Sequence, residues 1–131
     1  MKATGYFDGS CRPNPGEMGI GVVIEAESEV VAEVSKECGA GTSSEAEWIA
    51  LVWLLETAIK HGVDELEVRG DSQMVIKQIT GMWKLKAEHL SQHFKRARGL
   101  LPSFARVRFR WVNRRKNKRA DYLAAMSLKG R

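Results

Sequence analysis

Apolar and polar residues alternate along the first third of the chain and follow helical spacing further on. Three short apolar stretches, at residues 2–8, 19–25 and 30–34, have the alternation and composition of β-strands. The segments between them are short, so we expect the three strands to pair as an antiparallel meander. The first predicted strand ends on a carboxylate, Asp8, which small and polar residues follow.

The rest of the chain alternates between predicted helices and strands. The segment TSSEAEWIALVWLLETAIKHG begins with Thr and Ser and ends with Gly62, as helices often do. It is apolar almost all round, which predicts a largely buried helix. Further helices are expected at residues 71–81, 87–101 and 117–129, and further strands at residues 65–70 and 106–112.

The order of these elements, βββαβααβα, predicts a single α/β domain over residues 1–131, with one mixed sheet and helices on its faces. In the last predicted strand the apolar residues fall on one face, and three arginines fall on the other, where we expect them to be solvated. Three of the tryptophans are assigned to the core: Trp48, Trp53 and Trp111.

Four acidic residues occupy positions where this pattern leaves little room for charge. Asp8 ends the first strand, and Asp71 lies between a strand and a helix. Glu47 and Asp121 lie early in their helices, each on an apolar stripe that should face the sheet. The four acids are therefore candidates for a functional site.

Each of these acids also has an ordinary structural explanation. Glu47 could close a capping box with Ser44. An equal box between Thr42 and Glu45 would instead leave Glu47 facing inward. Asp71 could cap the helix that follows it, and the fourth acid could be a charge favoured at a helix N-terminus. For each residue taken singly, the sequence leaves both interpretations open.

Taken together, the four acids indicate a metal site. Strand ends and the first turns of the adjoining helices gather at one edge of an open α/β sheet, so these side chains should converge. Converging carboxylates repel one another and cannot all stay ionised unaided. Hard cations such as Mg²⁺ or Mn²⁺ accept oxygen ligands and remove that cost. A pair of them about 4 Å apart promotes displacement at a phosphodiester.

Charge and cysteine content narrow the class of protein. The chain has 21 Lys and Arg residues against 16 Asp and Glu, and residues 101–131 hold ten of the basic residues but one acid. A basic C-terminal third indicates a nucleic-acid partner or a solvated basic surface. Cys11 and Cys38 do not make a disulfide framework, and no apolar run suits a membrane span or a secretory signal. We therefore expect a cytoplasmic protein with no membrane contact.

Four segments, in order and at matching spacing, resemble type 1 ribonuclease H over essentially the whole chain. They are YFDGSCRPNPGEMGIGVVI, TSSEAEWIAL, VRGDSQMVIKQITGMWKLK and RRKNKRADYLA. Because so few residues separate Trp83 from Glu88, the chain is most similar to the compact archaeal and bacterial variety, which lacks a basic protrusion. The resemblance implies the ribonuclease H-like fold, with a mixed five-stranded sheet of three antiparallel strands and two more parallel to the first.

The resemblance also implies an activity and a ligand set. The family hydrolyses the RNA strand of RNA/DNA hybrids endonucleolytically with two Mg²⁺ ions, and Mn²⁺ should also support activity; the products carry 5′-phosphate and 3′-hydroxyl ends. The family's metal-binding carboxylates fall on Asp8, Glu47, Asp71 and Asp121. One ion would be held by Asp8, Asp71 and Asp121, and the other by Asp8 and Glu47.

Substrate contacts are carried over from the family in the same way. The glycines after Asp8, at positions 9, 16 and 19, would let the backbone approach the minor groove of the hybrid. Thr42 would hold a phosphate of the DNA strand, Gln73 would reach a base edge or ribose, and Trp83 would line the DNA channel, with ordinary packing as its alternative. The expected substrate-binding residues are Gly9, Ser10, Cys11, Arg12, Asn14, Thr42, Ser43, Ser44, Gln73, Trp83 and Asn117.

The chain departs from the family pattern in two places. Ser43 and Ser44 replace two asparagines, which should weaken hybrid affinity or strand discrimination and keeps cleavage of double-stranded RNA open. No histidine lies in the loop before Asp121, where larger relatives have one; Arg114 is assigned its phosphate-side role, with Arg115 as the alternative. A noncatalytic hybrid-binding module is the rival interpretation. We expect a monomer.

Overall fold

The computed structural model describes residues 1–128. Its strands are β1 (Lys2–Arg12), β2 (Gly16–Ala26), β3 (Glu29–Gly41), β4 (Glu65–Gly70) and β5 (Arg106–Trp111). Its helices are α1 (Ser43–Lys60), α2 (Gln73–Ile79), α3 (Ser91–Leu100) and α4 (Lys118–Ser127), with short 3₁₀ turns η1 (Glu88–Leu90), η2 (Leu101–Ser103) and η3 (Arg114–Lys116). None of the described helices is long and apolar enough to cross a membrane.

The five strands form one mixed sheet in the order β3-β2-β1-β4-β5. β1, β2 and β3 are antiparallel neighbours, and β4 and β5 run parallel to β1. The predicted ribonuclease H-like arrangement of strands is therefore confirmed. In the parallel register Phe7 pairs with Gly70, and Gly70 pairs with Trp111, so the carboxyl ends of three strands lie side by side.

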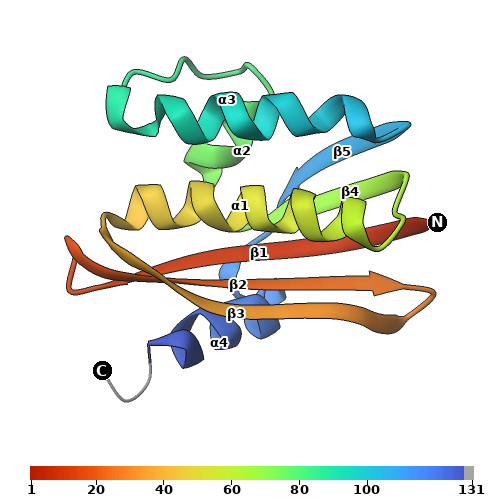
Figure 1. Ribbon diagram of the computed structural model, residues 1–131, viewed down its shortest axis with the longest axis horizontal. Helices are drawn as coiled ribbons and strands as arrows, with labels where there is room; N and C mark the ends of the chain where they lie inside the picture. The colour runs from red at the N-terminus through yellow and green to blue at the C-terminus, as the bar shows by residue number, and fades with distance from the viewer. Residues whose placement is uncertain (129–131) are drawn as a thin grey trace.

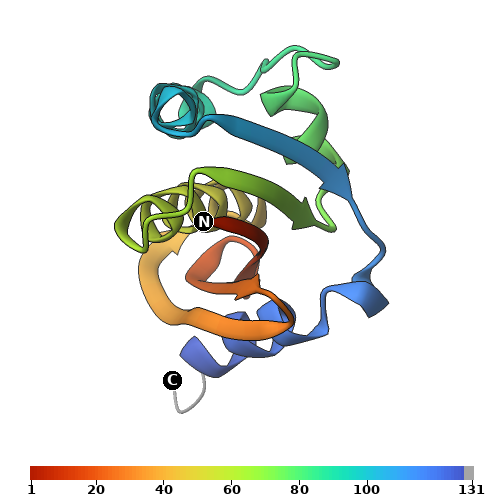
Figure 2. The ribbon, with the colours of Figure 1, turned by 90° about the vertical axis from the view of Figure 1, so that its right-hand side faces the viewer.

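Helices cover the sheet on both faces, as Figures 1 and 2 show. α1 packs on one face with α3 beyond it, and their core includes Phe7, Trp48 and Leu51. α4 packs on the other face, against β1, β2 and β3, where Ala120 and Leu123 meet Val23. The prediction of a largely buried α1 is thus confirmed, because eight of its residues are buried.

The structure corrects several predicted boundaries. β1 does not end at Asp8 but continues to Arg12, because residues 8–12 pair with β2 as far as Glu17. β3 is likewise much longer than predicted. The predicted helix at residues 71–81 is shorter, and the predicted helix at 87–101 is α3 flanked by 3₁₀ turns. Position 129, where the last helix was predicted to end, lies outside the described residues.

The three tryptophans assigned to the core have different environments. Trp48 is fully buried and Trp53 is partly buried against the core. Trp111 is 43% exposed, so its assignment to the core was wrong. It is the last residue of the edge strand β5, and its indole Nε1 donates a hydrogen bond to the carbonyl oxygen of Asp71 at 3.1 Å.

Candidate active site

Asp8 and Asp71 meet because of the register of the parallel strands. Phe7 is paired with Gly70, so the next residue of each chain segment, Asp8 and Asp71, lies at the same level of the sheet. Asp71 is not the helix cap that it could have been, because Ser72 caps α2 by accepting a hydrogen bond from Val75 N. Its carboxylate is therefore left for another purpose.

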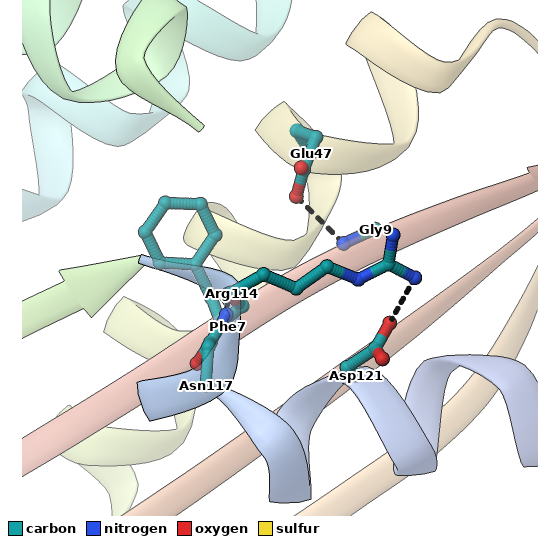
Figure 3. Close-up of polar contacts among 6 residues, drawn as sticks. All are labelled: Phe7, Gly9, Glu47, Arg114, Asn117 and Asp121. Carbon is teal, nitrogen blue, oxygen red and sulfur yellow. Dashed lines mark hydrogen bonds and ion pairs between the residues drawn. The ribbon is translucent and has the colours of Figure 1, made fainter. Parts of the chain in front are cut away.

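Glu47 reaches the same place from the first turns of α1. Thr42 is the N-cap of this helix, and its hydroxyl accepts a hydrogen bond from Glu45 N at 3.1 Å. The interpretation that leaves Glu47 facing the sheet is thus confirmed. Glu47 Oε1 accepts a hydrogen bond of 2.7 Å from Gly9 N, which fixes the carboxylate against β1 (Figure 3).

The packing of α1 on β1 requires a glycine at position 9. A Cβ at this position would overlap the backbone of Ala46 and Glu47, so only glycine lets β1 and α1 approach this closely. Added Cβ atoms at Gly16 and Gly19 would likewise strike protein atoms. Internal packing is therefore a sufficient reason for these glycines, and the N–H of Gly9 is already used by Glu47; the close approach of the hybrid to this stretch stays a prediction.

The carboxylates of Asp8, Glu47 and Asp71 form a compact cluster. One oxygen from each lies within 4.8 Å of the other two. Asp121, in the first turn of α4, lies at the border of this cluster, and it raises the pKa of all three residues through its negative charge. Its Oδ1 is 3.3 Å from Nη2 of Arg114, and Figure 3 shows this ion pair beside Glu47 and Gly9.

Burial and mutual repulsion make the cluster reluctant to ionise. Burial, followed by the charges of Glu47, Asp71 and Asp121, raises the pKa of Asp8 to about 10. Burial and the charge of Asp71 raise the pKa of Glu47 to about 8, although the Gly9 N–H and Arg114 oppose this. The pKa of Asp71 is also raised, mainly by burial.

This donor set suits hard cations. Several carboxylate oxygens converge, and their charges are not balanced by the nearby Arg114 alone. Oxygen ligands of this kind favour Mg²⁺ or Mn²⁺ over softer metals. The pKa shifts therefore fit a site in which divalent cations supply the missing positive charge.

Asn117 does not lie at a substrate surface. Its side chain is 1% exposed, and Nδ2 donates a hydrogen bond of 2.9 Å to the carbonyl oxygen of Phe7 (Figure 3). Its Oδ1 has no hydrogen-bond partner among the described residues. The predicted substrate contact is thus corrected: Asn117 ties the start of α4 to β1 next to Asp8 and positions the site from behind.

The structure brings two of the predicted substrate-binding segments together. Asn14, in the β1–β2 turn, bonds to Ser43 at the start of α1 through both polar atoms of its amide, at 2.9 and 3.1 Å. The thiol of Cys11 approaches the carbonyl oxygen of Gly41 at 3.3 Å. The residues that share this polar surface and remain partly or fully accessible are Ser10, Cys11, Arg12, Asn14, Thr42, Ser43 and Ser44.

The remaining predicted contacts lie on α2 and the segment after it. Gln73 is exposed at the first position of α2. Trp83 is 46% exposed, so ordinary core packing does not explain it, and the ammonium of Lys77 lies 4.7 Å from its ring centroid. Together they offer an aromatic face with an adjacent positive charge.

Sequence reasoning missed two contacts that support the site. Trp111 holds the carbonyl of Asp71, which the strand register could have suggested. His93 on α3 lies 2.8 Å from Glu45 of α1, close to the Thr42 cap. No local pattern links these two residues, because 47 others separate them along the chain and the packing of α3 on α1 brings them together.

Comparisons with known proteins agree with this geometry. A family model described as reverse transcriptase-like matches residues 6–127. A curated ribonuclease HI from Halobacterium salinarum is 42% identical over 124 residues, which are 94% of this chain and 62% of that protein. A Mycobacterium tuberculosis protein described as bifunctional is 37% identical over 126 residues, 95% of this chain but 35% of that protein. The chain therefore spans less than two thirds of the length of each of these curated relatives.

Solved structures match over nearly the whole chain. The crystal structure of ribonuclease H1 from Halobacterium salinarum has a TM-score of 0.95 at 40% identity and covers 98% of both chains. The N-terminal ribonuclease H domain of a Mycobacterium tuberculosis protein also has a TM-score of 0.95, at 35% identity, over 98% of this chain and 100% of that one. A ribonuclease H1 called LC11, solved in complex with an RNA/DNA hybrid, has a TM-score of 0.89 at 34% identity, over 97% and 96% of the two chains. The chain therefore belongs to the reverse transcriptase-like family and, within it, to the type 1 ribonucleases H.

Proposed function

We propose that the protein is an endonuclease that hydrolyses the RNA strand of RNA/DNA hybrids and leaves 5′-phosphate and 3′-hydroxyl ends. The observation that carries this proposal is the cluster of Asp8, Glu47 and Asp71, whose oxygens lie within 4.8 Å of one another, with Asp121 beside them. The relatives named ribonuclease H, one of them solved with a hybrid, support it.

The four carboxylates fit a pair of Mg²⁺ ions, with Mn²⁺ as a substitute. Asp8, Asp71 and Asp121 would hold one ion, and Asp8 and Glu47 the other. When bound, such ions stabilise an attacking hydroxide and a leaving 3′-oxygen as Lewis acids. The protein holds one of these ligands in place: the Gly9 N–H donates to Oε1 of Glu47 and fixes its carboxylate against β1.

Arg114 would supply a fixed positive charge at the border of the site. Its guanidinium pairs with Asp121 and is exposed, so it can also reach a phosphate. An arginine stays protonated near neutral pH, so it cannot serve as a proton donor or acceptor. Its contribution is electrostatic: it draws the phosphodiester toward the cluster and offsets part of the repulsion among the carboxylates.

The polar surface formed by the β1–β2 turn and the start of α1 would read the hybrid. Hydroxyl and amide groups at Ser10, Asn14 and Ser44 can bond to ribose 2′-hydroxyls, which distinguish RNA from DNA. Ser43 and Asn14 already bond to each other, so their side chains are held in place before the hybrid binds. The exposed ring of Trp83 with Lys77 would face the DNA strand.

The test is cleavage of an end-labelled RNA/DNA hybrid by the purified protein with Mg²⁺, with Mn²⁺ and with a chelator. Single-stranded RNA, duplex RNA and duplex DNA serve as controls. We expect metal-dependent cutting of the RNA strand of the hybrid. Binding without cutting in either metal would instead identify a noncatalytic hybrid-binding module. Cutting of duplex RNA as well would show that the serines at 43 and 44 relax the choice of strand.

The same proposal takes the protein to act as a monomer in the cytoplasm. Both cysteines are free, which suits a reducing compartment. Size-exclusion chromatography with light scattering would test the monomer, and a dimer that persists at nanomolar concentration would contradict it.

A further inference from the structure

In the described part of the chain, two pairs of polar side chains join α3 to α1, at different places along α1. His93 Nε2 lies 2.8 Å from Oε2 of Glu45, in the first turn of α1. Arg96 pairs with Glu56, eleven residues further along α1, which is about 16 Å along the helix axis. Figure 1 shows α3 running beside α1. The first pair therefore lies next to the candidate active site, and the second lies away from it.

The position of His93 is set by the packing of α3. The next residue, Phe94, packs edge-on against the ring of Trp48 in α1, with ring centroids 5.6 Å apart, and Ala97 of the same helix is fully buried. The side chain of His93 is 22% exposed and that of Glu45 is 25% exposed. A carboxylate only accepts hydrogen bonds, so Nε2 of the imidazole donates. His93 is thus a donor held in a fixed place beside the first turn of α1.

Both oxygens of the Glu45 carboxylate have defined neighbours. Oε2 accepts the hydrogen bond of His93. Oε1 lies against the backbone of Gly41, where an added Cβ would overlap it. The carboxylate is therefore held between α3 and the end of β3, beside the N-cap residue Thr42.

The capping box at the start of α1 is only half formed. The hydroxyl of Thr42 accepts the N–H of Glu45 at 3.1 Å, which is one of the two bonds of such a box. In the second bond, a glutamate at this position reaches back to the N–H of the N-cap residue. Among the described residues the Glu45 side chain makes no such bond, because its carboxylate is turned to His93. The Thr42 N–H is therefore left for another acceptor.

A box that stays open at this place favours an anion. The N-terminus of a helix carries the positive end of its dipole and N–H groups without helical partners, which together attract phosphates. A carboxylate turned to the Thr42 N–H would occupy this donor and put a negative charge beside an arriving phosphate. Thr42 and Ser44 belong to the polar surface that the proposed function assigns to the hybrid. The direction of the Glu45 side chain therefore controls how strongly the start of α1 attracts the hybrid.

We propose that His93 is a positioning residue for binding of the hybrid. It holds the Glu45 carboxylate on the α3 side, so that the Thr42 N–H and the positive end of the α1 dipole stay open to a phosphate of the hybrid. This inference rests on the proposed function, because the hybrid is the anion that the proposed function brings to this surface. Since His93 acts through Glu45, its effect should disappear when the glutamate is removed.

The first test measures affinity for a fluorescent RNA/DNA hybrid by anisotropy in a chelator, where no cleavage occurs. His93→Ala should weaken binding about tenfold, the effect of losing one hydrogen bond to a charged group. His93→Gln should retain most of the affinity, because its amide N–H can donate to Glu45 in place of the imidazole Nε2.

Arg96→Ala is the matched control, because it breaks the other contact between α3 and α1. It should change affinity by less than about twofold, as expected for an exposed ion pair away from the site. An equal loss in Arg96→Ala and His93→Ala would show that only the general anchoring of α3 matters, and would overturn the proposal. Thermal melts check that each variant is folded.

The second test repeats His93→Ala in a protein that lacks Glu45. In the Glu45→Ala background, His93→Ala should change affinity by less than about twofold, since no carboxylate is left to turn toward Thr42. The same loss in both backgrounds would show that His93 acts without Glu45, and would overturn the proposal.

Amide hydrogen exchange at Thr42, followed by NMR, reports on the capping box itself. His93→Ala should slow the exchange of this amide severalfold, because the freed Glu45 carboxylate then accepts its N–H. The double variant Glu45→Ala/His93→Ala should show no such slowing. Unchanged exchange in His93→Ala would overturn the proposal.

Cleavage with Mg²⁺ separates a positioning role in binding from damage to the carboxylate cluster. His93→Ala should raise KM severalfold and leave kcat nearly unchanged, because the ligands of the cluster are not moved. A fall in kcat with unchanged KM would overturn the proposal. Failure of the unmodified protein to cut any hybrid would instead overturn the proposed function, and binding in chelator would still report on His93.

Discussion

The acidic region, formed by Asp8, Glu47, Asp71 and Asp121, and a basic region, formed by Arg69, Arg110 and Lys116, are built in opposite ways. The acidic region is buried or half-buried, and burial with mutual repulsion raises the pKa of Asp8 to about 10. In the basic region Arg110 and Lys116 are exposed and Arg69 is half-buried beside Glu67, and arginines stay charged near neutral pH without help. The carboxylates of the acidic region therefore need added cations to ionise together, whereas the basic region carries its positive charge without a ligand.

The two regions also differ in how much of the fold they require. The acidic region joins β1, α1, β4 and α4, and depends on contact between the backbones of β1 and α1 at Gly9. The basic region is made by two strand ends and one short turn at the edge of the sheet. Small displacements should thus damage the acidic region far more than the basic one.

The largest effect is expected from removing a carboxylate of the acidic region. Asp8→Asn should fold normally and lose cleavage by about a thousandfold or more, because the metal clamp contributes several kcal/mol to the transition state. Hybrid cleavage at the normal rate would contradict the metal site.

A second test separates the regions by their need for close packing. Gly9→Ala should reduce cleavage about a hundredfold, because the new Cβ forces α1 and Glu47 away from β1. It should also lower the free energy of unfolding by about 1–3 kcal/mol. Gly99→Ala is the control, since a Cβ there meets nothing within 4 Å and should leave activity intact. Normal activity of Gly9→Ala would show that the backbone contact is dispensable.

Arg114 belongs to the boundary between the regions, and its neighbour Arg115 provides a matched comparison. Arg114 pairs with Asp121, whereas Arg115 is exposed and has no ion pair among the described residues. Arg114→Ala should lower kcat/KM about tenfold, in line with the loss of one charge-assisted contact. Arg115→Ala should change it little. A loss confined to Arg115→Ala would transfer the phosphate-side role to that residue.

A substitution of Asn117 distinguishes a residue that supports the acidic region from inside the protein from one that contacts the substrate. Asn117→Ala leaves the carbonyl of Phe7 without its buried partner, which should cost about 1–3 kcal/mol of stability. We expect a lower melting temperature and a severalfold lower kcat with little change in KM. Asn14→Ala, on the exposed polar surface, should instead raise KM and leave the melting temperature and kcat nearly unchanged. A raised KM with unchanged stability in Asn117→Ala would restore the substrate contact.

The smallest effect concerns the stability of the acidic region without metal. Folding raises the pKa of Asp8 from its ordinary 3.8 to about 10, so the unfolded chain releases this proton first as the pH rises. In chelator, stability should therefore fall between about pH 4 and pH 10. From pH 5 to pH 8 the melting temperature of Asp8→Asn should fall less than that of the unmodified protein. Equal pH dependence would contradict the raised pKa of Asp8, and added Mg²⁺ should reduce the difference between the two proteins.

Much of this protein was determined by its sequence alone, because the relevant signals are local. Apolar periodicity and cap residues predicted the order of strands and helices, including β4 at residues 65–70 without error. The same patterns singled out Asp8, Glu47, Asp71 and Asp121, since a carboxylate on an apolar stripe or at a strand end is visible in sequence. The choice between Thr42 and Ser44 as cap remained open until the structure.

The tertiary structure decided what depends on partners that are distant along the chain. Strand β1 continues beyond Asp8 because β2 supplies hydrogen bonds to a polar stretch that resembles a loop. Asn117 is buried and Trp111 is exposed because the packing of α4 and the edge position of β5 override residue type. Local patterns report propensity, whereas burial and pairing are set by residues that only the folded chain brings together.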